Sequence, residues 1–318
     1  MSGAQSGAQI GTQIGFLLPT REQIMQGRPE TGPLLSLAKR AADLGFDSVW
    51  VGDSLTARPR HDPLTLLAAV AGQSPGLTLG TAVLLPALRN PVLLAHQAAT
   101  LDQLTEGKLI LGVGFASDNP PIRAEFTAAG VPWEQRLGRM MEGLRLCKAL
   151  WSGQPIDWDG RWHLTRQTVA PIPARAGGPP LWIGGNLPAS LERAGKHFDG
   201  WFPNAPTPED YAAQLAQVRS VAQANGRDPA AITGAMYLTV TLDDDPAKAE
   251  DRMNRFFEHY YSQPAQRMRR RQICYAGPAG ALAEWLDRYI QAGASHLCLR
   301  IAGDHAQQLD IIARLLKP

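Results

Sequence analysis

The stretch "NPVLLAHQAATLDQLTEG" (residues 90–107), which runs directly into "KLILGVG" (108–114), decides the fold. Asn90 and Pro91 are typical of a helix start, because an asparagine side chain accepts hydrogen bonds from the first turn and proline suits its first position. Gly107 predicts the end of the helix. The short apolar run that follows is typical of a strand buried on both faces. A helix joined to a buried strand is one unit of an α/β protein.

The same unit recurs on both sides of this stretch. Apolar runs predict eight strands, at 14–19, 48–52, 77–86, 108–114, 180–185, 199–205, 232–242 and 296–303. Nearly every strand is followed by a helical pattern, and this alternation requires parallel strands with right-handed connections. Eight such units close a barrel more naturally than an open sheet. We therefore predict an α/β fold, a (β/α)8 TIM barrel with insertions, with a doubly wound sheet as the alternative.

Two segments interrupt the regular alternation. Residues 152–180 are rich in Gly, Pro and Trp and predict an excursion with a short hairpin that turns at Asp159-Gly160. Residues 246–292 predict two helices. We expect a flexible tail at residues 1–12 and a single domain over 13–318. The nearest match to a dinucleotide-binding turn, "GVGFAS" (112–117), lacks its third glycine and follows the fourth strand.

Composition excludes several classes of protein and site. The 44% hydrophobic and 19% charged residues argue against disorder, and a net charge of +2 is too weak to predict nucleic-acid or anionic-membrane binding. Three widely spaced cysteines and seven scattered histidines predict neither a disulfide framework nor a metal site. No apolar run is long enough to span a membrane, so a cytoplasmic protein is expected. The densest basic run, "RMRRRQ" (267–272), favours a solvated helix face over a phosphate patch.

Polar residues end the second predicted strand, "VWVGDS" (49–54). The carboxyl ends of barrel strands carry the active site, so Asp53 and Ser54 are candidate catalytic residues. The alternative is that Asp53 caps the following loop or pairs with a barrel arginine, for which Arg300 is the obvious candidate. His163, in the predicted hairpin, is the histidine best placed to meet a ligand if the hairpin folds over the barrel mouth.

The other strand ends are apolar or rich in glycine. Small or flat side chains there suit a planar aromatic cofactor that brings its own reactivity. The residues are Leu18, Thr81, Ala82, Val83, Gly114, Phe115 and Ala116. After the fifth strand, Gly184, Gly185 and Asn186 precede a helix whose first turn would expose N–H groups to a phosphate. A tight turn with Asn186 as an ordinary helix cap explains the same residues.

Four segments resemble the bacterial-luciferase-like flavin oxidoreductases, in the same order over roughly residues 13–317: "LAKRAADLGFDSVWVGDSL", "LTLGTAVLLPALRNPVLLAHQAATLDQLTEGKLILGVGFA", "PPLWIGGNLPASLERAGKHFDGWFPNAPTPEDY" and "ASHLCLRIAG". The resemblance implies a β/α barrel that binds FMN or the related deazaflavin coenzyme at the strand ends. It places Asp53 and Ser54 at the family's polar pair and residues 81–83 beneath the flavin ring, where some members have a non-proline cis peptide. It places residues 114–116 at the fourth strand end and residues 184–186 at the phosphate-binding turn.

The resemblance leaves the activity open between two chemistries. We expect a monooxygenase that uses O2 and reduced FMN, supplied by a separate flavin reductase, on a small organic substrate. The alternative is a hydride-transfer reductase or dehydrogenase that uses the deazaflavin coenzyme (F420 type), whose anionic tail would need arginines such as Arg58, Arg60, Arg123 and Arg161. A non-catalytic flavin-binding relative is a third hypothesis. Many members carry a histidine where this chain has Ser54, which leaves His61, His163 or no protein acid for that role. A homodimer is also expected.

Overall fold

A computed structural model describes residues 11–316, so most of the predicted tail (1–12) lies outside the described residues, as do residues 317–318. The eight predicted strands are all present, as β1 (Gln13–Leu17), β2 (Ser48–Val51), β3 (Thr78–Leu84), β4 (Leu109–Val113), β7 (Leu181–Ile183), β8 (Gly200–Trp201), β9 (Thr233–Leu242) and β11 (His296–Ile301). Their hydrogen-bonded order returns from β8 through β9 and β11 to β1, which closes a parallel barrel. The predicted (β/α)8 fold is confirmed.

Helices connect the strands, and the helix start at Asn90 and Pro91 follows the predicted cap signal. They are α1 (Thr20–Met25), α2 (Gly32–Asp43), α3 (Pro63–Gln73), α4 (Pro91–Leu104), α5 (Pro120–Ala128), α6 (Arg136–Leu150), α7 (Pro188–His197), α8 (Pro208–Ala224), α9 (Pro246–Tyr261), α10 (Ala265–Arg269), α11 (Ala279–Gln291) and α12 (His305–Leu316). Asn90 accepts hydrogen bonds from the N–H groups of Val92 and Leu93. No helix within residues 11–316 is long and apolar enough to cross a membrane.

The structure adds a strand where only helices were expected. Between α10 and α11, β10 (Cys274–Gly277) pairs with the carboxyl-terminal part of β9, from Thr239 to Leu242. Its four residues are mostly half-buried and follow a run of arginines, so they show neither alternation nor a continuous apolar run. The prediction of two helices across residues 246–292 is therefore wrong, because three helices and an edge strand occupy that segment.

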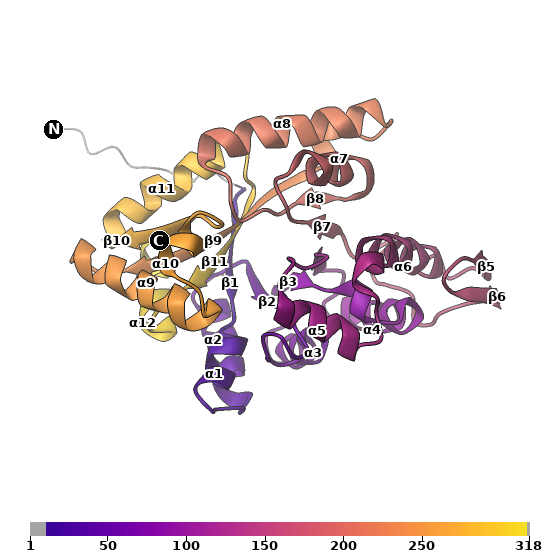
Figure 1. Cartoon of the computed structure of the whole chain (residues 1–318), viewed down its shortest axis with the longest axis horizontal. Coiled ribbons are helices and arrows are strands. Elements are labelled where there is room, and N and C mark those ends of the chain that lie inside the picture. Colours follow the sequence, from indigo (N-terminus) through magenta and orange to yellow (C-terminus); the bar gives the residue numbers. More distant parts are fainter. Residues whose placement is uncertain (1–10, 317–318) are drawn as a thin grey trace. The chain divides into compact units, whose positions relative to one another are not determined.

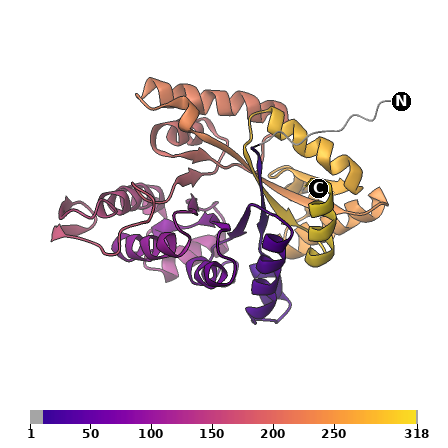
Figure 2. The ribbon, with the colours of Figure 1, turned by 180° about the vertical axis from the view of Figure 1, so that it is seen from behind.

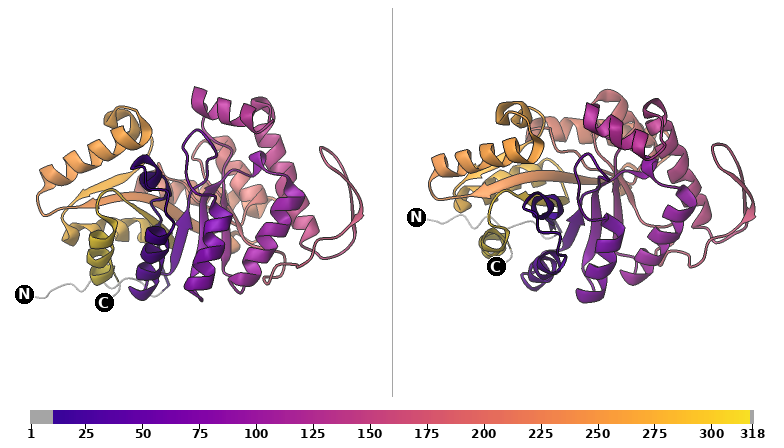
Figure 3. Two further views of the ribbon diagram at one scale, coloured as in Figure 1. Left: turned by 90° about the horizontal axis from the view of Figure 1, so that it is seen from below. Right: turned by 60° about the horizontal axis from the view of Figure 1, so that its bottom comes forward.

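The predicted hairpin is present within the excursion. The antiparallel strands β5 (Ile156–Asp159) and β6 (His163–Gln167) extend beyond α6 (Figure 3). Glu142 of α6 accepts a hydrogen bond from the N–H of Arg161 at 2.7 Å and forms an ion pair with its guanidinium. The turn of the hairpin is therefore tied to α6, although both strands are largely exposed.

The chain forms two compact units. One contains Ser36–Trp50 and Trp182–Pro318 with the N-terminal strand, and the other contains Pro19–Leu35 and Val51–Leu181. In the first unit α12 lies beside α2, where Arg40 and Asp310 form an ion pair (Figures 1 and 2). We still treat the single domain over residues 13–318 as a prediction.

Aromatic rings on or directly after four strands pack against one another inside the barrel. Trp50, Trp182, Phe202 and His296 are almost fully buried, with ring centroids 5.1 Å apart for Trp50 and Phe202 and 5.2 Å apart for Trp50 and His296. Ser48 links two members of this cluster, because its hydroxyl bonds both Trp50 Nε1 and His296 Nε2 at 2.8 Å. The interior is thus a packed core. In this fold the active site is expected at the carboxyl ends of the strands.

Candidate active site

Asp53, directly after β2, is held by an arginine. Its side chain is 1% exposed and accepts hydrogen bonds from both terminal nitrogens of the Arg89 guanidinium and from the N–H of Leu85. Arg89 also reaches Asp62 Oδ2 at 3.2 Å. The expectation of an arginine partner for Asp53 is correct, but the partner is Arg89, 36 residues further on, and not Arg300. Arg300 instead donates to the Tyr261 hydroxyl.

Electrostatics favour the charged forms of Arg89 and Asp62. Burial acts to lower the pKa of Arg89, but the charges of Asp53 and Asp62 outweigh it and raise the pKa above its ordinary value. Burial likewise acts to raise the pKa of Asp62, but the N–H of Thr65 and the charge of Arg89 lower it overall. Asp53 therefore accepts hydrogen bonds in a fixed orientation, which suits a positioning group at a strand end.

The Ser54 side chain is hydrogen-bonded to a buried carboxylate, Glu125, which the sequence analysis did not identify. Its hydroxyl donates to Glu125 Oε1 at 2.6 Å, and the same oxygen accepts from the N–H groups of Leu55, Thr56 and Ala57 at 2.5, 2.8 and 3.2 Å. Glu125 lies on α5 and is 1% exposed. The start of α5 carries the same signal as α4, because Asn119 caps it before Pro120. That signal could have located the helix, but not the contact across 71 residues.

The ends of β3 and β4 bring backbone close together. The peptide between Ala82 and Val83 is cis, as in some members of the family that the sequence resembles. A Cβ on Gly114 would lie 2.8 Å from Val83 Cγ2, so only glycine fits there. The Thr81 hydroxyl donates to the Gly112 carbonyl at 2.8 Å, which turns it away from ligand binding. Ala82, Val83, Gly114, Phe115 and Ala116 are partly exposed, and their contact with a ring system stays a prediction.

The turn after β7 has the properties of an anion site. Gly185 has a φ of +100°, and a Cβ there would lie 2.9 Å from Ser190 Oγ. Trp201 Nε1 donates to the Gly185 carbonyl at 2.8 Å and fixes the turn. The N-cap of α7 is Leu187, and not Asn186 as one reading of the sequence expected. Leu187 makes no side-chain cap hydrogen bond, and residues 185–189 are exposed, so the helix start fits a phosphate.

Two further predicted site residues have other partners. His163 is 76% exposed and contacts Asp159 within the hairpin at 2.9 Å. In the described part of the chain, no hydrogen bond joins it to Asp53 or Ser54. Leu18 is 1% exposed and pairs with the Trp50 carbonyl through its N–H. Among residues 11–316, no group of three metal-ligating side chains is found.

Two of the four arginines considered for an anionic tail already have carboxylate partners. Arg123 forms a bidentate pair with Asp118, and Arg161 pairs with Glu142. Both side chains of the Arg123–Asp118 pair are exposed, so each charge is balanced by its partner at the protein surface. Arg123 and Arg161 are therefore poor candidates for binding an anionic tail, and Arg58 and Arg60 stay predictions.

A closed parallel barrel with glycine-rich and polar strand ends defines the class as a β/α-barrel enzyme. The family model described as luciferase-like monooxygenase matches residues 12–307, and the chain belongs to this family. A 5,10-methylenetetrahydromethanopterin reductase from Methanolobus tindarius is 33% identical over 221 residues, which are 69% of this chain and 65% of that protein. The chain thus matches slightly less than two thirds of that relative.

Two further relatives match nearly the whole chain. An F420-dependent glucose-6-phosphate dehydrogenase from Mycolicibacterium smegmatis is 28% identical and covers 90% of this chain and 93% of its own. The solved structure of an F420-dependent secondary alcohol dehydrogenase in complex with an F420-acetone adduct has a TM-score of 0.82 and 21% identity. It covers 97% of this chain and 100% of its own, and at this identity the likeness concerns the fold.

Proposed function

We propose that the protein is an oxidoreductase that uses a deazaflavin coenzyme to transfer hydride to or from a small organic substrate. The observation that carries the proposal is the near-complete match to a dehydrogenase named as F420-dependent. The sequence alone predicts a different chemistry, a monooxygenase that uses reduced FMN. The family description keeps that chemistry as the second candidate.

The strand ends fit such a coenzyme. Gly184, Gly185 and the uncapped start of α7 would hold its phosphate, because the turn has no Cβ in the way and the helix dipole favours an anion. That residues 82–83 and 114–116 bear on its ring follows from the family resemblance and stays a prediction. When bound, the coenzyme supplies a ring carbon that accepts or donates hydride. The protein's own part is then to orient the two reactants.

The polar pair after β2 acts in this proposal by positioning. Asp53 is oriented by Arg89 and can accept a hydrogen bond from a ligand only along a fixed direction. The Ser54 hydroxyl donates a hydrogen bond to Glu125 and accepts one from the N–H of Arg58 at 2.9 Å, so it fixes the loop shape. His163 keeps a catalytic role only if the hairpin folds over the strand ends. The small substrate and the homodimer stay proposals, and a flavin reductase is needed only for the monooxygenase.

A binding titration separates the two chemistries. The purified protein is titrated with oxidised deazaflavin coenzyme, FMN and reduced FMN, followed by fluorescence under anaerobic conditions. We expect micromolar or tighter binding of the deazaflavin and much weaker binding of both FMN forms. Tight binding of reduced FMN with negligible affinity for the deazaflavin would overturn the proposal and restore the monooxygenase.

A further inference from the structure

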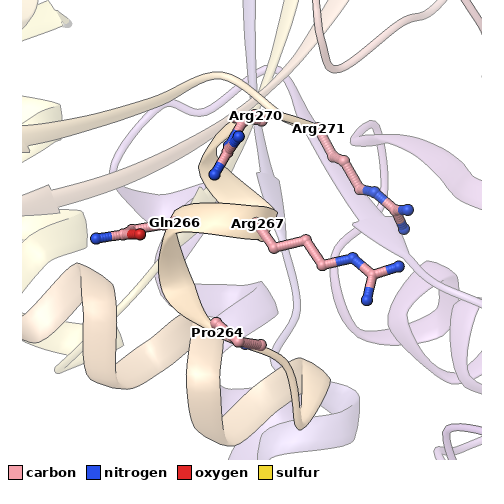
Figure 4. Close-up of a pocket in the computed structure, with 5 residues that line it drawn as sticks. All are labelled: Pro264, Gln266, Arg267, Arg270 and Arg271. Atoms are coloured by element: carbon pink, nitrogen blue, oxygen red, sulfur yellow. The ribbon is translucent and has the colours of Figure 1, made fainter.

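The basic run 267–272 lines a pocket rather than a plain helix face. Pro264, Gln266, Arg267, Arg270 and Arg271 surround a cavity of about 440 Å³ (Figure 4). That volume lies within the range of roughly 300–1,000 Å³ that is typical of small-molecule sites. We propose that this pocket binds an organic anion, through a phosphate or carboxylate group.

The first argument is uncompensated charge. In the described part of the chain, Arg267, Arg270 and Arg271 form no salt bridge, and Arg267 donates only to the neutral amide oxygen of Gln263. Arg269, in the same segment, is fully engaged with Glu250 and Asn254. Three unpaired guanidinium groups within five residues repel one another, and a bound anion would relieve that repulsion.

The second argument is that the arginines stand on a fixed platform. Ala265 and Met268 of α10 are buried with Met253 and Phe257 of α9. This packing sets which face of α10 is outward, and Arg267 is on that face. The helix ends at Arg269, so Arg270 and Arg271 belong to a turn and do not continue the helical spacing.

The third argument is the place of the segment in the barrel. Directly after the arginines, the N–H of Ile273 donates to the carbonyl of Asn204, which follows β8, at 2.8 Å. The next residue, Cys274, pairs with Thr239 of β9. The pocket segment is thus tied to the carboxyl ends of two barrel strands, where ligands of this fold bind.

The shape of the cluster favours an oxygen anion. Arg267 and Arg271 extend their guanidinium groups to one side of the segment, while Gln266 leaves on the other (Figure 4). Guanidinium groups bind phosphate and carboxylate oxygens in pairs of parallel hydrogen bonds. The anion belongs either to the substrate or to the tail of the deazaflavin coenzyme. This inference deepens the proposed function, but it is tested without coenzyme and can therefore fail separately.

The test is calorimetric titration of the purified protein with inorganic pyrophosphate and with citrate at low salt. We expect both to bind, and the double variant Arg267→Gln/Arg271→Gln to bind them roughly tenfold or more weakly. The control is Arg145→Gln/Arg255→Gln, which removes the same charge from exposed positions on α6 and α9. It should keep the affinity of the unmodified protein. No binding to the unmodified protein, or an equal loss in both double variants, would overturn the proposal.

A second titration identifies the source of the anion. Both double variants are titrated with the complete deazaflavin coenzyme and with its ring system lacking the phosphate-bearing tail. If the pocket variant weakens only the complete coenzyme, the anion is the tail. If both forms bind as before while pyrophosphate binding is lost, the anion belongs to the substrate. Both results keep the site and differ only in its occupant.

Discussion

After β2, the polar residues Asp53 and Ser54 are bound by their own neighbours, whereas after β7 the turn at residues 184–186 leaves a helix start without a side-chain cap. Both stretches follow buried strands and both look like ligand sites in the sequence. The difference teaches that a polar strand end can serve the loop beside it, while a strand end made of glycine leaves its backbone open to a ligand.

The largest effect is expected at Glu125, which organises the β2 end. Glu125→Ala would leave the Ser54 hydroxyl and three backbone N–H groups without their acceptor. Removing a buried charged acceptor should lower the free energy of unfolding by about 3–5 kcal/mol. Urea denaturation measures it. Glu125→Gln keeps an acceptor oxygen and should lose less than half as much. An unfolding free energy of Glu125→Ala within 1 kcal/mol of that of the unmodified protein would show that Glu125 does not organise the β2 end.

A somewhat smaller loss is expected at Arg89. Arg89→Gln would leave the carboxylate of Asp53 buried beside a neutral partner and should cost about 2–4 kcal/mol in unfolding free energy. The double variant Asp53→Asn/Arg89→Gln removes both charges and should recover part of the loss. A double-mutant cycle by urea denaturation gives the coupling between the two residues. Additive losses would mean that the pair does not hold the strand end.

At the β7 end the expected change is in affinity. Gly185→Val forces a branched side chain into a φ of +100° against Ser190. The variant should bind a flavin or deazaflavin that carries a phosphate about tenfold more weakly or worse. A factor of ten corresponds to about 1.4 kcal/mol of binding free energy. Riboflavin, which lacks the phosphate, should lose much less. Gly226→Val, at a φ of +73° with open space around it, controls for backbone strain. Equal weakening of both ligands would show that the phosphate site is misplaced.

The smallest effect concerns a third strand end, where His305 begins α12 after β11. Burial lowers the pKa of His305 to about 4, from an ordinary value of 6.5. Folding therefore favours its neutral form, and that stability is present above pH 6.5 and is lost as the pH falls toward 4. Between pH 7 and pH 5 the loss should be about 1–2 kcal/mol more than in His305→Gln. Parallel pH profiles of unfolding for the two proteins would refute this.

Local signals explain how much of the fold was predictable. Apolar runs located all eight barrel strands, and the Asn90 cap marked the start of α4 correctly. The edge strand β10 was not predicted, because it is a strand through its pairing with β9 and not through its own hydrophobic pattern. Propensity carries little information for such a half-buried edge segment.

The site was less predictable, because its contacts join residues far apart in the sequence. Asp53 and Ser54 were recognised from their position after a strand, but their partners lie 36 and 71 residues away. Glycine turns were easier to find, since their role depends on the local backbone. The arginine run at 267–272 has the pattern of a solvated face, and the three arginines that line the pocket are exposed, so the sequence alone gives no sign of it.

The single oxygen of Glu125 that gathers four donors has a consequence for hydrogen exchange. Leu55 and Thr56 expose their side chains at the surface, and Leu55 is 46% exposed. Their amide protons are nevertheless held by one buried acceptor, so they can exchange with solvent only when the loop leaves Glu125 as a whole. The amides of residues 55–57 should therefore exchange slowly and together, on the timescale of a cooperative opening.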